Sequence, residues 1–244
     1  MTRKKSSSQR VVAVVLGAGQ GSRMGYQINK VFLPLNGKPI IIYAIETFEH
    51  SPEVDEIILV AAAGEEEQLA KLVRHANCNK VSHIVRGGAS RHASELCALE
   101  VLRPGIEAGN VEVVLIHDGA RPFISVDQVE RLITKAREEG GAILAVPLQE
   151  EERIAEVNNE NFIQRSFEGE QAWKAQTPQA FQAPLLLKAY DEAKRNLFHG
   201  TDTAASVELI GGHVAIVESD AINLKITTAQ DLFLAERLSG YLSF

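Results

Sequence analysis

The chain has 244 residues and a mass of 26.6 kDa, with 45% hydrophobic and 23% charged residues. This balance is ordinary for a globular protein, excludes a mostly disordered chain, and allows a core that needs no disulfide or structural metal. Thirty-two acidic against 25 basic residues give a net charge of −7, which argues against a nucleic-acid-binding protein, since such proteins carry a basic excess. No apolar run approaches the roughly 20 residues that a membrane span requires. We therefore expect neither nucleic acid nor membrane as a partner.

The two cysteines, Cys78 and Cys97, stand apart and show no metal-binding spacing. We expect both to be small buried side chains of a protein in the reducing cytoplasm. The first ten residues, MTRKKSSSQR, are basic and serine-rich, and they predict a disordered tail before a single domain over residues 11–244. A signal peptide is the alternative for this start. It is disfavoured because only about six apolar residues follow the basic stretch, fewer than the h-region of a signal peptide needs.

Up to Pro147, short apolar segments alternate with amphipathic ones. The apolar segments predict strands at Val11–Leu16, Glu56–Ala62, Ser82–Val85, Val111–His117 and Ala142–Val146. The amphipathic segments predict helices at Ile40–His50, Glu65–His75, Arg91–Leu102 and Asp127–Glu139, the third of them ending at Arg103-Pro104-Gly105. Strands that are apolar throughout are typical of a sheet covered on both faces. We therefore expect an α/β fold with a doubly wound, mainly parallel sheet.

This alternation breaks after Pro147. An acidic run is followed by Arg153–Val157 and Phe162–Phe167, which predict a β-hairpin outside the sheet. Such an arm, over about residues 148–171, is often a dimerisation device, although a surface hairpin needs no function. The remaining segments predict a helix at Ala183–Arg195, a helix after Thr201-Asp202, a strand at Val214–Val217, and a last helix from Thr228 to about Tyr241. Thr228 is the expected N-cap of that last helix, with Asp231 completing the cap.

The segment LGAGQGSRMGYQINK, residues 16–30, predicts a phosphate-binding loop after the first strand. Its glycines allow close approach of the backbone to phosphate, and Arg23 and Lys30 supply positive charge. The dinucleotide fingerprint GxGxxG does not fit, because the sixth position from Gly17 is Ser22, and the Walker pattern is absent. A dehydrogenase is therefore disfavoured. A glycine-rich turn without a ligand is the alternative for this loop considered alone.

Six segments together resemble the 2-C-methyl-D-erythritol 4-phosphate cytidylyltransferase family. They are LGAGQGSRMG…NK, RGGASRHAS (Arg86–Ser94), HDGARPF (His117–Phe123), QTPQAF (Gln176–Phe181), TDTAAS (Thr201–Ser206) and NLKITT (Asn223–Thr228). HDGARPF and NLKITT are specific to this family and to close relatives such as the ribitol 5-phosphate enzymes. The resemblance implies a fold of the nucleotide-diphospho-sugar transferase type, a homodimer with an exchanged arm, and the use of CTP, a small phosphorylated polyol and Mg²⁺.

The resemblance also implies roles for individual residues. Arg23, Lys30 and Lys225 would stabilise the triphosphate and the charge on the transferred phosphorus, and Asp118 would hold Mg²⁺ and the ribose region. Cytosine and the nucleotide would be bound by Gly17, Ala18, Gly19, Gly88 and Ser94. The acceptor would be held by Arg121, Thr177 and Lys225. His117 has no evident proton-transfer partner and is interpreted as structural.

The arm departs from the family pattern. The family reads PV-x-DT-x-K after the fifth strand, whereas this chain has Glu151 at the position of the threonine. Eight residues before TPQ the family has an arginine, where this chain has Gly169. Both family residues help to bind the acceptor phosphate, so Arg153 or Arg165 would have to compensate.

Three functional hypotheses follow. The first is CMP transfer from CTP to 2-C-methyl-D-erythritol 4-phosphate, with direct in-line attack of the acceptor phosphate on the α-phosphorus. The second is the same chemistry on another polyol phosphate or a phosphonate. The third is a non-catalytic CTP-binding protein, which is disfavoured because Arg23, Lys30, Asp118, Arg121 and Lys225 are all retained.

Overall fold

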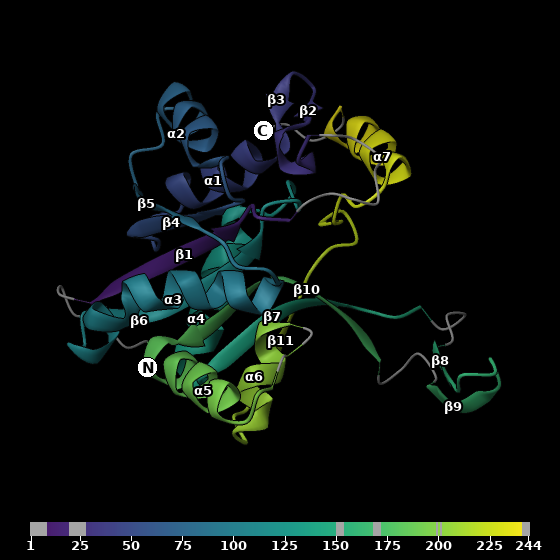
Figure 1. The fold of residues 1–244 in the computed structure, drawn as a ribbon. Helices are drawn as coiled ribbons and strands as arrows, with labels where there is room; N and C mark the ends of the chain where they lie inside the picture. Colours follow the sequence, from purple (N-terminus) through teal and green to yellow (C-terminus); the bar gives the residue numbers. More distant parts are fainter. Residues whose placement is uncertain are drawn as a thin grey trace.

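The computed structural model describes residues 9–19, 28–149, 154–167, 172–198, 200 and 202–240. A seven-stranded sheet with the order β11-β7-β10-β6-β1-β4-β5 forms its centre (Figure 1). Its strands are β1 (Arg10–Leu16), β4 (Glu56–Ala61), β5 (Val81–Arg86), β6 (Val111–Asp118), β7 (Gly141–Pro147), β10 (Trp173–Gln182) and β11 (Ala215–Glu218). Strand β10 runs antiparallel to both of its neighbours, while β1, β4, β5 and β6 pair in parallel, as do β7 and β11. The predicted α/β fold with a mainly parallel sheet is confirmed.

Helices cover both faces of this sheet because successive residues of each strand point to opposite sides. In β1, Val11, Ala13 and Val15 belong to one hydrophobic cluster, which includes residues of α1 (Ile40–His50), α2 (Glu66–His75) and α4 (Val126–Glu139). Val12 and Val14 belong to a second cluster, with α3 (Arg91–Glu107), α5 (Ala183–Arg195) and α6 (Thr203–Leu209). The two clusters form the doubly covered core that the apolar strands predicted.

A third, smaller cluster lies beside the start of α1. It joins β2 (Pro34–Leu35), which follows η2 (Lys30–Phe32) and precedes β3 (Lys38–Pro39), to α1 and to α7 (Ala229–Ser239). Helix α7 begins with the predicted cap, because Thr228 Oγ1 accepts from the backbone N–H of Asp231, while the Asp231 carboxylate accepts from the N–H of Thr228. This packing brings the segment that contains Lys225 beside α1.

Helix α3 extends five residues beyond its predicted end at Leu102, so that prediction was wrong. Pro104 lies inside the helix, where it removes one hydrogen-bond donor. Tertiary contacts hold the last turn in place: Ile106 is buried in the second cluster, and Arg103 Nη2 donates to Asp191 of α5 at 2.7 Å. Packing of the helix therefore outweighs the local effect of proline.

Strand β10 was not predicted from the sequence. Its Pro178 has no N–H to donate, and the register of its pairing with β7 shifts between Ala175 and Gln179. Both features interrupt the sequence pattern that is typical of a strand, although Gln176–Phe181 is buried throughout. The strand lies between β6 and β7, so the QTPQAF segment packs beside the carboxyl end of β6.

The predicted hairpin is present as β8 (Ile154–Val157) and β9 (Ile163–Phe167), which pair only with each other and project from the body of the molecule (Figure 1). Glu151, Arg153 and Gly169 lie outside the described residues. At the other end of the chain, β1 already begins at Arg10, inside the predicted tail, whose residues 1–8 are not described. In the described part of the chain, no helix combines the length and the apolar character of a membrane span.

Phe181→Ala tests the packing of β10 between the sheet and its helices. The Phe181 ring is fully buried, and it lies where a Cβ on Gly141 would come within 2.6 Å. We expect a loss of about 3–5 kcal/mol in the free energy of unfolding, measured in urea, because truncation leaves a cavity. Phe233→Ala in α7 is the control, since Phe233 is 59% exposed and should change stability by about 0.5 kcal/mol or less. Equal losses in the two variants would contradict the position of β10 in the core.

Candidate active site

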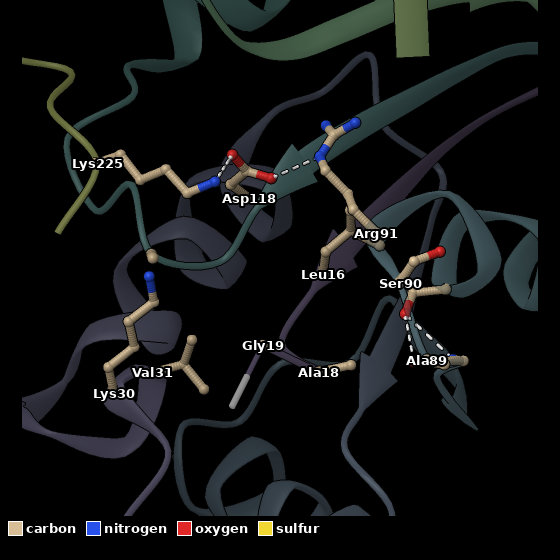
Figure 2. Close-up of a pocket in the computed structure, with 13 residues that line it drawn as sticks. Leu16, Ala18, Gly19, Lys30, Val31, Ala89, Ser90, Arg91, Asp118 and Lys225 are labelled. Atoms are coloured by element: carbon tan, nitrogen blue, oxygen red, sulfur yellow. Dashed lines mark hydrogen bonds and ion pairs between the residues drawn. The ribbon is translucent and has the colours of Figure 1, made fainter. Parts of the chain in front are cut away.

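A pocket of about 450 Å³ lies at the carboxyl ends of β1 and β6, where ligands bind in open α/β sheets (Figure 2). This volume is in the range of small-molecule sites. The pocket is lined by Leu16, Ala18, Gly19, Lys30, Val31, Gly88, Ala89, Ser90, Arg91, Ser94, Asp118, Ala120 and Lys225. Seven predicted site residues are thus brought together: Ala18, Gly19, Lys30, Gly88, Ser94, Asp118 and Lys225.

Asp118, the last residue of β6, is the acidic side chain of this lining. Its Oδ2 accepts from Lys225 Nζ at 2.7 Å, and its Oδ1 accepts from Arg91 Nε at 3.2 Å. Arg121 Nε lies 3.8 Å from Oδ2. Burial alone would raise the pKa of the Asp118 carboxyl, but the charges of Arg91, Lys225 and Arg121 outweigh it and hold that pKa well below its usual range. Asp118 is therefore an anion at any physiological pH, surrounded by an excess of positive charge.

Lys30 enters the pocket from the side opposite Arg91, below Lys225 (Figure 2). Its position is set by Asn29, which is buried and caps η2 by accepting from the N–H of Val31. The Asn29 amide donates to the carbonyl of Gly17 and to Glu65 Oε2, both at 2.7 Å. One side chain therefore ties the lysine to the glycine-containing loop after β1.

The other wall of the pocket is the start of α3, whose 17 residues place the positive end of a helix dipole there. Gly88 approaches this helix so closely that a Cβ on it would lie 2.5 Å from Ala93 Cβ. Its N–H donates to Ser94 Oγ at 3.2 Å. Gly17 is similarly confined, since a Cβ on it would lie 3.0 Å from Ile41 Cδ1. Packing within the protein therefore leaves no room for a side chain at either position.

Thr177 and His117 lie beneath the pocket rather than in its lining. The backbone N–H of Asp118 donates to Thr177 Oγ1 at 3.0 Å, and Thr177 Oγ1 lies 3.2 Å from His117 Nδ1. His117 Nε2 lies 3.1 Å from the carbonyl of Arg121, which can only accept, so Nε2 carries the proton and Nδ1 accepts from Thr177. This series of hydrogen bonds holds the backbone of Asp118 on the side away from the pocket. It agrees with a structural role for His117. It also commits the Thr177 hydroxyl within the protein.

Arg121 is anchored by Nη1, which donates to the carbonyl of Asn223 at 2.8 Å. Asn223 is fully buried, and its side-chain amide donates to Gln176 Oε1 and to the carbonyl of Thr177, each at 3.0 Å. Two residues after Asn223 comes Lys225. The NLKITT, QTPQAF and HDGARPF segments therefore meet at one buried residue, Asn223.

Arg23 lies outside the described residues, so its role remains a prediction. Arg91 lines the pocket and binds Asp118, although it was not among the predicted site residues. Its presence in RGGASRHAS, as the first residue of a predicted helix, was the only signal that could have indicated it.

Comparisons with known proteins place this geometry in a family. The model of the 2-C-methyl-D-erythritol 4-phosphate cytidylyltransferase family matches residues 11–240. The chain belongs to this family. Relatives with that name from Shouchella clausii and Geobacter metallireducens are each 42% identical to it, over 93% of this chain and 95% and 96% of theirs.

Solved structures of cytidylyltransferases agree with this assignment. The 4-diphosphocytidyl-2C-methyl-D-erythritol synthase of Anaerococcus prevotii superposes with a TM-score of 0.82 at 25% identity, over 96% of this chain and 97% of that one. The 2-C-methyl-D-erythritol 4-phosphate cytidylyltransferase of Thermus thermophilus gives a TM-score of 0.72 at 29% identity, over 93% and 98% of the two chains. The chain is thus similar over nearly its whole length to nucleotidyltransferases.

The buried His117 predicts a pH-dependent stability of this cytidylyltransferase. Burial lowers the pKa of His117 to about 4, against an ordinary value near 6.5. Between these values the unfolded chain takes up a proton that the folded one does not, so stability is retained above pH 6.5 and is lost as the pH falls toward 4. For His117 alone the loss is up to about 3 kcal/mol.

Urea unfolding at pH 7 and pH 5 should show a smaller loss of stability for His117→Gln than for the unmodified protein. NMR titration of the His117 ring in the unmodified protein is the second measurement, and it does not depend on the variant folding. A midpoint near 6.5 would contradict the buried, neutral ring.

Proposed function

We propose that this protein transfers CMP from CTP to 2-C-methyl-D-erythritol 4-phosphate and releases pyrophosphate. The observation that carries the proposal is the Asp118 carboxylate, bound by Lys225 and Arg91 in a pocket that Lys30 also lines. Membership of the cytidylyltransferase family supports the choice of nucleotide and acceptor. A phosphate oxygen of the acceptor attacks the α-phosphorus of CTP in line, and pyrophosphate leaves without a covalent enzyme intermediate.

The protein's part in this reaction is positioning and charge stabilisation. CTP brings about four negative charges and the acceptor phosphate about two more, which repel each other unless fixed cations offset them. Lys30 and Lys225 enter the pocket from different chain segments and would contact the phosphates, with Arg23 as a third cation. Lys225 Nζ has three donors, so it can bind phosphate oxygens while it keeps its bond to Asp118.

Asp118 suits a Mg²⁺ ion that arrives with the nucleotide. The described residues contain no group of three or more side chains that could hold a metal ion. One carboxylate is typical of Mg²⁺ that takes its other ligands from substrate phosphates and water. Bound there, Mg²⁺ would offset charge on the phosphates. The low pKa of Asp118 keeps the ligand ionised without any change of protonation.

The remaining site residues divide between nucleotide and acceptor. Gly17, Ala18, Gly19, Gly88 and Ser94 would bind cytosine and the nucleotide through backbone groups, which the close packing of Gly17 and Gly88 keeps fixed. Arg121 would hold the acceptor phosphate; its Nε makes no hydrogen bond within the described part of the chain. Thr177 would act on the acceptor only if its hydroxyl leaves His117.

We also propose a cytoplasmic homodimer in which each arm packs on the partner. Four large apolar side chains of the hairpin are 47–66% exposed: Ile154, Val157, Phe162 and Ile163. Apolar surface of this kind is typical of an interaction site. Sedimentation equilibrium should therefore give twice the chain mass of 26.6 kDa. Changing Phe162 and Ile163 together to Ser should shift the protein toward monomer, and a monomer before any change would contradict the proposal.

Removing either pocket lysine should abolish most turnover. In Lys30→Ala and Lys225→Ala we expect a loss of about a hundredfold or more in kcat, since each change removes a fixed charge from the transition state. Pyrophosphate release from CTP with Mg²⁺ measures this. Lys135→Ala on the outer face of α4, away from the pocket, is the control and should keep normal turnover. Near-normal kcat in both pocket variants would contradict the site.

The arm predicts a weakened acceptor site. Glu151 and Gly169 replace a family threonine and arginine, and a lost charge-assisted contact to phosphate is worth roughly 1.5–3 kcal/mol. We therefore expect kcat/KM for 2-C-methyl-D-erythritol 4-phosphate to rise about tenfold to a hundredfold in Glu151→Thr/Gly169→Arg, while the Kd for CTP stays unchanged. If another polyol phosphate or a phosphonate is the native acceptor, the double change should impair its use. No gain with either acceptor would show that Arg153 or Arg165 already fills this role.

A further inference from the structure

Two sequence motifs that contain residues without an assigned role meet beside the pocket. Arg91 belongs to RGGASRHAS at the start of α3, and Thr203 belongs to TDTAAS at the start of α6. Both contact Glu95, one turn along α3: Arg91 Nη1 forms an ion pair with Glu95 Oε1, and Thr203 Oγ1 donates to the same oxygen at 3.2 Å. The same Arg91 side chain binds Asp118 through Nε. A continuous polar path therefore runs from α6 to Asp118.

Burying the Glu95 carboxylate at this position costs folding free energy. Its side chain is 1% exposed, and burial raises its pKa to about 7, against the opposing effects of Arg91 and Thr203. A buried ion pair seldom improves stability over apolar side chains of the same size, because both charges lose their hydration. Stability alone therefore does not explain a carboxylate here, whereas fixing the orientation of Arg91 does.

We propose that Glu95 is a positioning residue that fixes Arg91 and, through it, orients the Asp118 carboxylate for a divalent cation bound with CTP. This inference rests on the proposed function, since it needs the metal at Asp118. Glu95 does not line the pocket. It acts only through the arginine.

The geometry of Arg91 supports this role. Its guanidinium is planar, so the bond from Nε to Asp118 Oδ1 and the bonds from Nη1 to Glu95 and Thr203 fix one another's direction. Lys225 holds the other oxygen of Asp118. The carboxylate is thus bound at both oxygens. The contact from Arg91 is held in turn by the buried side chains of Glu95 and Thr203, between α3 and α6. Lysine at position 91 would keep the charge but lose this fixed geometry.

The test measures the binding of CTP with and without Mn²⁺ rather than turnover. The Kd for CTP is measured once in chelator and once with Mn²⁺, whose binding is followed by water-proton relaxation. The Kd in chelator divided by the Kd with Mn²⁺ gives the metal's contribution to CTP affinity. We expect Glu95→Gln to reduce this ratio about tenfold while the Kd in chelator changes little. Glu100→Gln is the matched control, because Glu100 also pairs with an arginine of α3, Arg103, but lies on the exposed surface. It should leave the ratio unchanged.

A double-mutant cycle shows whether Glu95 acts through Asp118. Asp118→Asn should remove the metal's contribution, and adding Glu95→Gln to it should change nothing further, since coupled residues are not additive. Arg91→Lys should reduce the ratio as Glu95→Gln does. If Glu95→Gln fails to fold, Arg91→Lys takes its place in the test. A normal ratio in Glu95→Gln or Arg91→Lys, or an additive double variant, would overturn this proposal while leaving the metal at Asp118. A normal ratio in Asp118→Asn would overturn both.

Discussion

The ion pairing of Asp118 is the interaction on which the rest of the site depends. Its two oxygens are bound by Lys225 and Arg91, and Arg121 lies within 3.8 Å of one of them. These cations come from three different parts of the chain, so a single carboxylate organises the end of β6, the start of α3 and the segment before α7. The net charge of the protein is −7, yet the pocket is rich in positive charge. A local excess of this kind suits a triphosphate.

The fold keeps these charges in place by a layer of buried polar side chains beneath the pocket. Asn223 joins the segment of Lys225 to β10 and to Arg121, while Thr177 and His117 hold the backbone of Asp118. Below this layer the sheet is apolar on both faces, so the polar contacts have a rigid base. Preorganised charges lower a barrier because they need no rearrangement when charge develops.

Much of this arrangement could be predicted from the sequence. The apolar strands and their alternation with amphipathic helices predicted the doubly covered sheet, and the glycine-containing loop after the first strand predicted one wall of the pocket. Local patterns failed where tertiary contacts decide the outcome. Pro104 marks a helix end by propensity, but packing of Ile106 carries α3 through it. Pro178 prevented the prediction of β10, although the strand lies inside the sheet between β7 and β6.

The site showed the same division. Lys30, Asp118 and Lys225 could be predicted because each stands in a recognisable motif. Arg91 and Glu95 could not, since their importance depends on contacts between α3, β6 and α6 that no short segment records.

The most direct measurement is pyrophosphate release from CTP, with Mg²⁺ and 2-C-methyl-D-erythritol 4-phosphate, by the unmodified protein and by Asp118→Asn. We predict release that needs both substrates in the unmodified protein, and a loss of about a hundredfold or more in a variant that keeps its fold. Equal turnover by the two proteins would contradict the central role of Asp118.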